Sequence, residues 1–173
     1  MFKRSLILFA VVLSFSGCWN KDFQEPGRIQ VAKKPTEAII GGNFQRVWAA
    51  TQAALAKLPM IRKDVDASTA RAYVVTDWNR GKSDVLFHGF GENRMPYVIR
   101  YKLYVYLATG VGGTRVTIKN IEQYMDDSIT AGVDFQGGVY TWIKTESSGL
   151  KENAILEQIN KLVHDPQFKG DAQ

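Results

Sequence analysis

Residues 97–108 read Tyr-Val-Ile-Arg-Tyr-Lys-Leu-Tyr-Val-Tyr-Leu-Ala, and the rest of the predicted architecture is built around them. Their side chains alternate as in a β-strand that buries one face. The face predicted to point inward holds Tyr97, Ile99, Tyr101, Leu103, Val105 and Leu107. The opposite face holds Val98, Arg100, Lys102, Tyr104 and Tyr106. Residues 110–113 predict a tight turn, after which residues 114–124 return as a second strand with Arg115 and Lys119 on its outward side.

Shorter strand-like segments flank this hairpin. Residues 61–65 are a short alternating segment, and residues 70–78 contain the β-favouring Tyr73-Val-Val-Thr76; both precede the hairpin. Residues 79–95 contain three glycines and many polar residues, so we expect a long hairpin loop there, in which residues 84–87 favour extending a strand. Residues 138–144 are expected to add a short strand or turn.

Apolar side chains recur at helical spacing in two segments that bracket the strands. The first stripe is Phe44, Val47, Trp48, Thr51, Leu55 and Leu58. The second stripe is Leu150, Ala154, Ile155, Ile159, Leu162 and Val163. Asn43 is the expected N-cap of the first helix, Ser147 or Ser148 caps the second, and Pro59 and Pro166 mark the ends. The order α-β-β-β-β-α predicts an α+β fold in which two amphipathic helices cover one face of an antiparallel sheet.

The N-terminus has the pattern of a secretory signal, with Lys3 and Arg4 followed by an apolar run over residues 6–15. That run is shorter than the roughly 20 residues a membrane-spanning helix needs. The segment Phe15-Ser16-Gly17-Cys18 resembles the lipobox of bacterial lipoproteins. The resemblance implies that Cys18 becomes the first residue of the mature protein and carries palmitate-type acyl chains. The alternative is an ordinary cleaved signal with an incidental cysteine.

Composition limits the remaining possibilities. The chain has 173 residues, two His and one Cys, which excludes an internal disulfide and a cysteine-based zinc site. Removing residues 1–17 takes away Lys3 and Arg4 and no acid, which leaves 20 cations and 17 acids, a net charge of +3. We therefore expect no nucleic-acid partner.

The residue after Cys18 bears on the membrane to which a lipoprotein goes. In lipoproteins an Asp after the acylated cysteine retains the protein in the inner membrane. Because Trp19 stands at this position, we expect the periplasmic face of the outer membrane.

The predicted organisation has four parts. Residues 1–17 are the signal, residues 18–42 a lipidated flexible tether, residues 43–165 one domain, and residues 166–173 a polar tail. The sequence leaves the oligomeric state open.

No residue pattern predicts catalysis. His88 lies in a glycine-containing loop without the strand-turn-helix context of a phosphate cradle, and His164 with Asp165 falls at a helix end. Asp126 and Asp127 match no spacing of calcium ligands. Because no nucleophile, base and orienting group assemble, we expect a non-enzyme without cofactor or metal.

Two surfaces remain as candidates for binding. The first is an interaction surface of interleaved basic and aromatic side chains that suits a protein partner or acidic headgroups, with an ordinary solvent-facing sheet as the alternative. Its members are Arg100, Lys102, Tyr104, Tyr106, Arg115 and Lys119. The second is a cleft between sheet and helix lined by Trp78 and Trp142. The alternative is that both tryptophans belong to the hydrophobic core.

Part of this pattern resembles a known family. Phe44-x-x-Val47-Trp48-x-Ala50, then Ala54-Leu55, an alternating strand and Tyr73-Val-Val, is similar to the helix-grip domains of the BamC/NlpB-like outer-membrane assembly lipoproteins. The resemblance covers about residues 43–164 and implies a helix-grip fold. It also implies an accessory role in outer-membrane β-barrel assembly, with subunits of that machinery as partners. The alternative function is a carrier or sensor of a lipid or other apolar ligand in the envelope.

Overall fold

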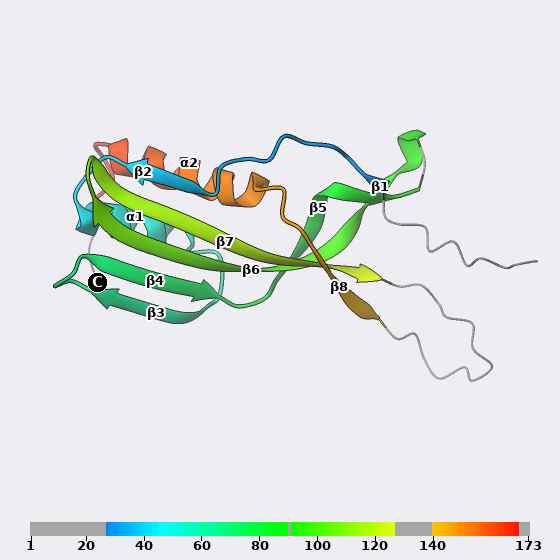
Figure 1. The fold of residues 1–173 in the computed structure, drawn as a ribbon, viewed down its shortest axis with the longest axis horizontal. Coiled ribbons are helices and arrows are strands. Elements are labelled where there is room, and N and C mark those ends of the chain that lie inside the picture. The colour runs from blue at the N-terminus through cyan, green and yellow to red at the C-terminus, as the bar shows by residue number, and fades with distance from the viewer. Residues whose placement is uncertain (1–26, 90, 127–139, 170–173) are drawn as a thin grey trace, which may run out of the picture.

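The computed structural model describes residues 27–89, 91–126 and 140–169, which form a curled antiparallel sheet and two packed helices (Figure 1). The elements in chain order are β1 (Gly27–Arg28), β2 (Glu37–Ile40), α1 (Phe44–Ala54), β3 (Met60–Asp66), β4 (Arg71–Thr76), β5 (Asn79–His88), the short 3₁₀ helix η1 (Gly91–Asn93), β6 (Met95–Gly110), β7 (Gly113–Asp126), β8 (Thr141–Thr145) and α2 (Leu150–His164). The described part of the chain is therefore a mixed α+β fold.

The β6–β7 hairpin runs the length of the sheet and organises the other strands (Figure 1). Its pairing extends from Ile99 opposite Tyr124 to Gly110 opposite Gly113. Strand β6 pairs with β5 along its first half and with β4 along its second half, and β3 pairs with β4. Strand β7 pairs with β2 near the turn and with β8 at the far end. Each end of the hairpin is thus widened by different strands on both sides.

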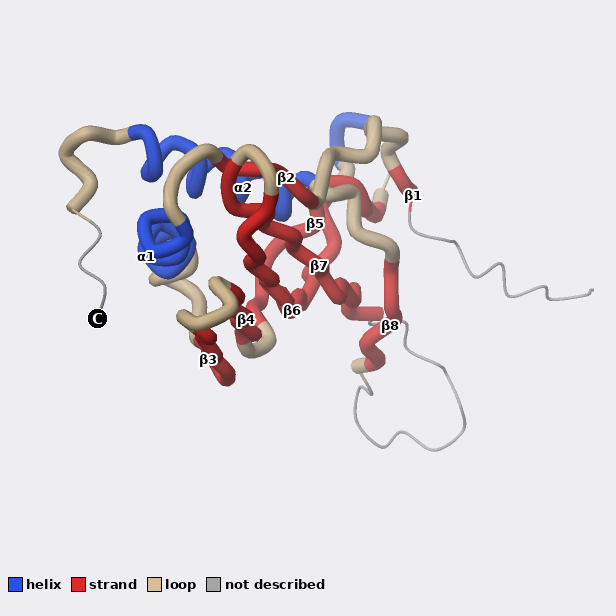
Figure 2. Tube along the Cα trace, turned by 60° about the vertical axis from the view of Figure 1, so that its left-hand side comes forward, coloured by secondary structure: helices blue, strands red, loops and turns tan. Residues whose placement is uncertain are grey.

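Both helices pack on one face of the sheet, beside the half that includes β2, β3 and β4 (Figures 1 and 2). Side chains from α1, α2 and the inward face of β6 and β7 fill the layer between them. The largest that are almost completely buried are Ile40, Leu55, Leu103, Ile118 and Ile159. Each such side chain contributes about 1.5–3 kcal/mol by leaving water, so this layer is the main source of stability.

Both helices and the central hairpin form where the sequence predicts them, although α1 ends at Ala54, before Leu58 and Pro59. The predicted inward residues Ile99, Leu103, Val105 and Leu107 are all buried, and Tyr101 is partly buried. Helix α1 starts after Asn43, whose side chain accepts a hydrogen bond of 2.8 Å from the amide of Arg46. This is the expected N-cap, because the first amides of a helix have no partner within the helix.

The sheet is larger than the order α-β-β-β-β-α predicts, since the described residues include six strands between the helices and two before α1. Residues 79–88 form β5 rather than part of a long loop, and they pair with β6. Residues 37–40, expected in the tether, form β2 and pair with β7. Phe168, expected in the polar tail, packs against the core. These short segments gain their structure from pairing and packing rather than from a clear alternation of their own.

Helix α2 also differs in detail from the prediction. Its buried residues are Glu152, Leu156, Ile159 and Val163, whereas Ala154 is exposed. Gly149 occupies the N-cap position with φ of 79°, and a Cβ there would collide with the carbonyl oxygen of Lys34. Ser148, one of the two expected caps, accepts a hydrogen bond of 3.3 Å from the amide of Leu150.

The C-terminal end of α2 is held by a side chain from α1. Arg46 donates hydrogen bonds of 2.7 Å each to the carbonyl oxygens of Val163 and Asp165. His164 Nδ1 lies 2.8 Å from the carbonyl oxygen of Asn160, so this ring serves the helix end as the sequence predicted. The two hydrogen bonds from Arg46 satisfy carbonyls at the end of α2 that have no partner within the helix.

Replacing Leu103 by Ala should destabilise the protein by about 2–5 kcal/mol, because it leaves a cavity in the filled layer. Leu103 is 0% exposed and lies at the centre of β6. Guanidinium unfolding followed by circular dichroism measures the loss. The control is Val111→Ala at the hairpin turn, where the side chain is 97% exposed and little change is expected. Equal effects of the two substitutions would contradict this account of the core.

Candidate functional site: a basic and aromatic sheet face

The face of the sheet that points away from α1 and α2 carries a strong excess of positive charge; we call it the open face. Strand pairing assigns residues to it, because directly opposed residues share a face. Its cations are Arg62, Arg71, Arg80, Lys82, Arg100, Lys102, Arg115, Lys119 and Lys144. Its acids are Glu37, Asp64 and Asp66. Among the described strand residues, the open face therefore carries nine cations and three acids.

A row of stacked side chains crosses the open face near the hairpin turn. The rings of Tyr73 on β4 and Tyr106 on β6 lie 4.8 Å apart. The guanidinium of Arg62 is 5.6 Å from the Tyr73 ring, and the ammonium of Lys119 is 5.7 Å from the Tyr106 ring. Partial burial and the neighbouring Tyr106 raise the pKa of Tyr73. These cation–π contacts hold two of the charges in place while leaving them at the surface.

A second cluster occupies the other half of the open face. The guanidinium of Arg100 lies between two indoles, 4.7 Å from the Trp78 ring and 4.5 Å from the Trp142 ring. Its Nε donates a hydrogen bond of 2.7 Å to Oε1 of Gln123 on β7. Trp78 follows β4 and Trp142 lies in β8, so the cluster joins segments distant in sequence. All three side chains are partly buried.

The predicted interaction residues fall together. Arg100, Lys102, Tyr104 and Tyr106 share the open face of β6, and Arg115 and Lys119 share it on β7. Tyr106 is 40% exposed, which leaves its ring accessible. Trp78 and Trp142 do not line a cleft between sheet and helix; they flank Arg100 instead. The two surfaces that the sequence suggested separately are one surface.

Other candidates are separate from this face or outside the described residues. His88, at the end of β5, is exposed, with its ring 5.0 Å from that of Tyr97. Asp126 ends β7, whereas Cys18 and Asp127 lie outside the described residues. In the described ranges, no three His, Cys, Asp or Glu side chains are grouped as metal ligands, and no helix is long and apolar enough to cross a membrane.

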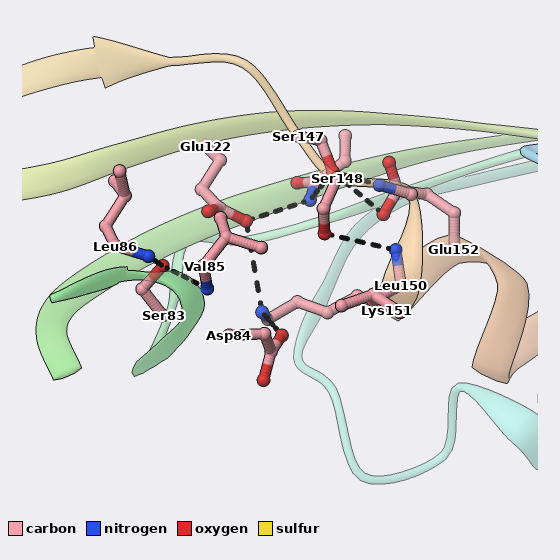
Figure 3. A network of polar contacts seen from close by, with 12 residues as sticks. Ser83, Asp84, Val85, Leu86, Glu122, Ser147, Ser148, Leu150, Lys151 and Glu152 are labelled. Atoms are coloured by element: carbon pink, nitrogen blue, oxygen red, sulfur yellow. Dashed lines mark hydrogen bonds and ion pairs between the residues drawn. The ribbon is translucent and has the colours of Figure 1, made fainter. Parts of the chain in front are cut away.

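A polar cluster that the sequence analysis missed lies on the helix side, where α2 begins (Figure 3). Lys151 Nζ lies 2.5 Å from Oδ2 of Asp84 and 4.0 Å from Oε2 of Glu122. Ser147 Oγ donates a hydrogen bond of 3.0 Å to Oε2 of Glu152. Glu122 and Glu152 are only 4% and 2% exposed. The cluster joins α2 to β5 and β7.

Asn120 connects the two buried glutamates. Its Nδ2 lies 3.3 Å from Oε2 of Glu122 and 3.3 Å from Oγ of Ser147. Burial raises the pKa of Glu122, while Lys151 and Asn120 lower it and Glu152 and Asp84 raise it further. A hollow of about 240 Å³ borders the cluster, lined in part by Lys33, Asn120 and Glu152. Because the contacts of these carboxylates run between α2, the residues just before it and strand β7, we assign them to positioning α2.

The sequence did contain a signal for this cluster. Glu122 follows Val116 and Ile118 at even spacing on β7, so its inward orientation continues their alternation. Glu152 precedes Leu156 and Ile159 at helical spacing on α2. If charged residues had been counted as possible members of the apolar stripes, the spacing would have predicted that Glu122 and Glu152 point inward.

Comparison with known proteins adds no assignment. No protein-family model matches the sequence, and no curated protein shows significant similarity to it.

Replacing Arg100 by Ala should destabilise the protein by about 1–2 kcal/mol, because it removes the cation between two indoles. Denaturant unfolding measures the loss, and tryptophan fluorescence of the folded protein should shift as Trp78 and Trp142 lose their shared neighbour. The matched control is Arg80→Ala, since Arg80 is the exposed cross-strand partner of Arg100 on β5. Equal effects of both substitutions would argue against the stacked arrangement.

Replacing Glu122 by Gln should change how stability depends on pH. The pKa of Glu122 lies above its ordinary value of 4.5 in the folded chain, so the folded state retains a proton that the unfolded state releases. Stability of the wild type therefore falls as pH rises from 4.5 through the folded-state pKa, and the Gln variant lacks this fall. The variant should gain on the wild type as pH rises from 4.5.

Urea unfolding at several pH values measures this difference. The control is Glu92→Gln, because Glu92 is exposed in η1. A variant that falls further behind the wild type as pH rises would show that the attraction between Glu122 and Lys151 outweighs the cost of burial. A difference in stability that does not change with pH would show that the pKa of Glu122 is not shifted on folding.

Proposed function

We propose that this chain is a non-catalytic, lipid-anchored protein at the periplasmic face of the outer membrane, with an accessory role in outer-membrane β-barrel assembly. The lipobox-like Phe15-Ser16-Gly17-Cys18 and the Trp19 that follows it support the anchor and its location. Subunits of the assembly machinery are the expected partners. The helix-grip resemblance supports this role.

The observation that carries the proposal is the unequal covering of the sheet. One face is buried under α1 and α2 by almost fully buried side chains such as Leu103 and Ile159. The other carries the stacked basic and aromatic side chains of the open face. Aromatic and arginine side chains held at a surface are typical of binding sites rather than of solvent-exposed sheets. The geometry therefore favours a domain that works by contact.

The arrangement of the helices supports the helix-grip assignment. Helices α1 and α2 contact each other and pack on the same face of a curled antiparallel sheet. In chain order they stand on either side of the strands β3 to β8. This agrees with the predicted bracketing of the sheet by two helices.

The alternative, a carrier of an apolar ligand, has less support. Such a protein needs an enclosed apolar cavity of about 300 Å³ or more. Between sheet and helices the space is occupied by residues with exposures of 0–1%, among them Leu55, Leu103 and Ile118. A hollow of about 440 Å³ lies instead at β3, β4 and β6, open to solvent and lined in part by Asp64, Tyr73 and Leu107.

The proposal is tested by crosslinking the tagged full chain in cells and identifying the recovered proteins by mass spectrometry. Wild type should recover β-barrel assembly subunits and should incorporate labelled palmitate. Cys18→Ala should lose the label and recover fewer partners, because the domain is no longer held at the membrane.

The control is Ser14→Ala, which alters the leader but keeps Cys18. It should behave as wild type. Wild type recovered without assembly subunits would overturn the accessory role, and wild type without label would overturn the anchor. Recovery with a bound lipid alone would favour the carrier.

A further inference from the structure

Positive charge is concentrated on the open face beyond what the composition suggests. The mature chain has a net charge of only +3, whereas the open face has nine cations and three acids. The rest of the mature chain is therefore net negative. All three acids are counted as ionised in this comparison: hydrogen bonds from Ser68 and Thr69 lower the pKa of Asp66 to about 2, and Glu37 lies 3.5 Å from Arg115. The open face is suited to an anionic partner.

The cations are spread over a broad surface rather than gathered in a groove. They extend from Arg62 on β3, through Lys102 and Lys119 on the central hairpin, to Lys144 on β8. An extended acidic peptide contacts a narrow line of residues, whereas a layer of lipid headgroups presents charge over an area. The spread of the cations therefore favours a membrane surface.

The aromatic residues support the same partner. Tyr73, Tyr106, Trp78 and Trp142 stand among the cations, and each is at least partly exposed. Tyrosine and tryptophan are enriched where proteins meet the headgroup region, since their rings are amphipathic. A row of tyrosines and a pair of tryptophans between cations is the composition expected at such a boundary.

The length of chain before the domain permits this contact. Cys18 precedes Gly27, the first described residue, by nine positions. Nine residues span about 30 Å at full extension. An acylated Cys18 would keep the domain within that distance of the bilayer, so the open face could reach the lipid headgroups.

We propose that the open face is a second membrane attachment, which binds the phosphate-bearing headgroups of anionic lipids beside the acylated N-terminus. This rests on the proposed lipid anchor. Acyl chains and a basic surface act together in many peripheral proteins, because each basic residue near an anionic surface adds a further increment of binding. The stacked Arg100 and Lys119 hold their charges at the surface before the membrane is met.

Vesicle co-sedimentation tests the proposal with the acyl chains removed. The protein is the full mature chain, residues 18–173, carrying Cys18→Ala. It is mixed with vesicles of phosphatidylcholine alone or with about 30% phosphatidylglycerol, which supplies an anionic surface. We expect binding to the anionic vesicles only, weakened as sodium chloride is raised, because salt screens exposed charges.

A matched pair of double variants locates the contact. Lys119→Gln with Lys144→Gln removes two exposed charges from the open face and should weaken binding about thirty-fold. Lys57→Gln with Lys161→Gln removes two exposed charges beside and on the helices and should leave binding unchanged. Circular dichroism confirms that both variants are folded.

Equal binding to neutral vesicles, no binding to either kind, or an equal loss in both double variants would overturn the proposal. So would sedimentation that soluble polyglutamate abolishes at an equal charge concentration, since an acidic polypeptide would then be the preferred partner. These results leave the accessory role intact if crosslinking in cells still recovers assembly subunits. Loss of those crosslinks with retained vesicle binding would instead overturn the proposed function alone.

Discussion

The register of the β6–β7 hairpin is the constraint on which the rest of the structure depends. Its pairing is continuous from Ile99 and Tyr124 to the glycine turn, where Gly112 and Gly113 have φ of 86° and 144°. A Cβ on Gly113 would collide with the carbonyl oxygen of Ile40, so the turn also fixes how closely β2 approaches. Because side chains alternate along a strand, a shift by one residue would exchange the core for the basic surface.

Because of this alternation, the same two strands supply both the buried side chains that stabilise the fold and the exposed side chains of the open face. Leu103 and Val105 anchor the layer under the helices, and Lys102, Tyr104 and Tyr106, which alternate with them, lie on the opposite side. A surface built on a rigid, paired strand keeps its side chains in a fixed spacing. Three cations of the open face, Arg62, Arg100 and Lys119, are also held by stacking on neighbouring rings.

The buried carboxylates limit how α2 can sit on the sheet. Glu122 and Glu152 are almost fully buried, and only partners at the right positions offset the loss of hydration. Lys151 and Ser147 provide these partners in one arrangement of α2 against β7. At the other end Arg46 binds the last carbonyls of α2. Polar contacts thus position the helix, while apolar packing supplies most of its stability.

The sequence by itself determined the features that repeat along a short stretch of chain. Period-two alternation marked the two faces of residues 97–108, helical spacing marked α1 and α2, and Asn43 marked a helix start. Tertiary pairing decided the rest. Strand β2 falls in the predicted tether, and strands β5 and β8 are predicted only in part, as residues 84–87 and 138–144, because their side chains show no clear alternation before they pair. Trp78 and Trp142 meet Arg100, and Glu122 meets Lys151, only because register brings distant segments together, and no local periodicity encodes such a distance.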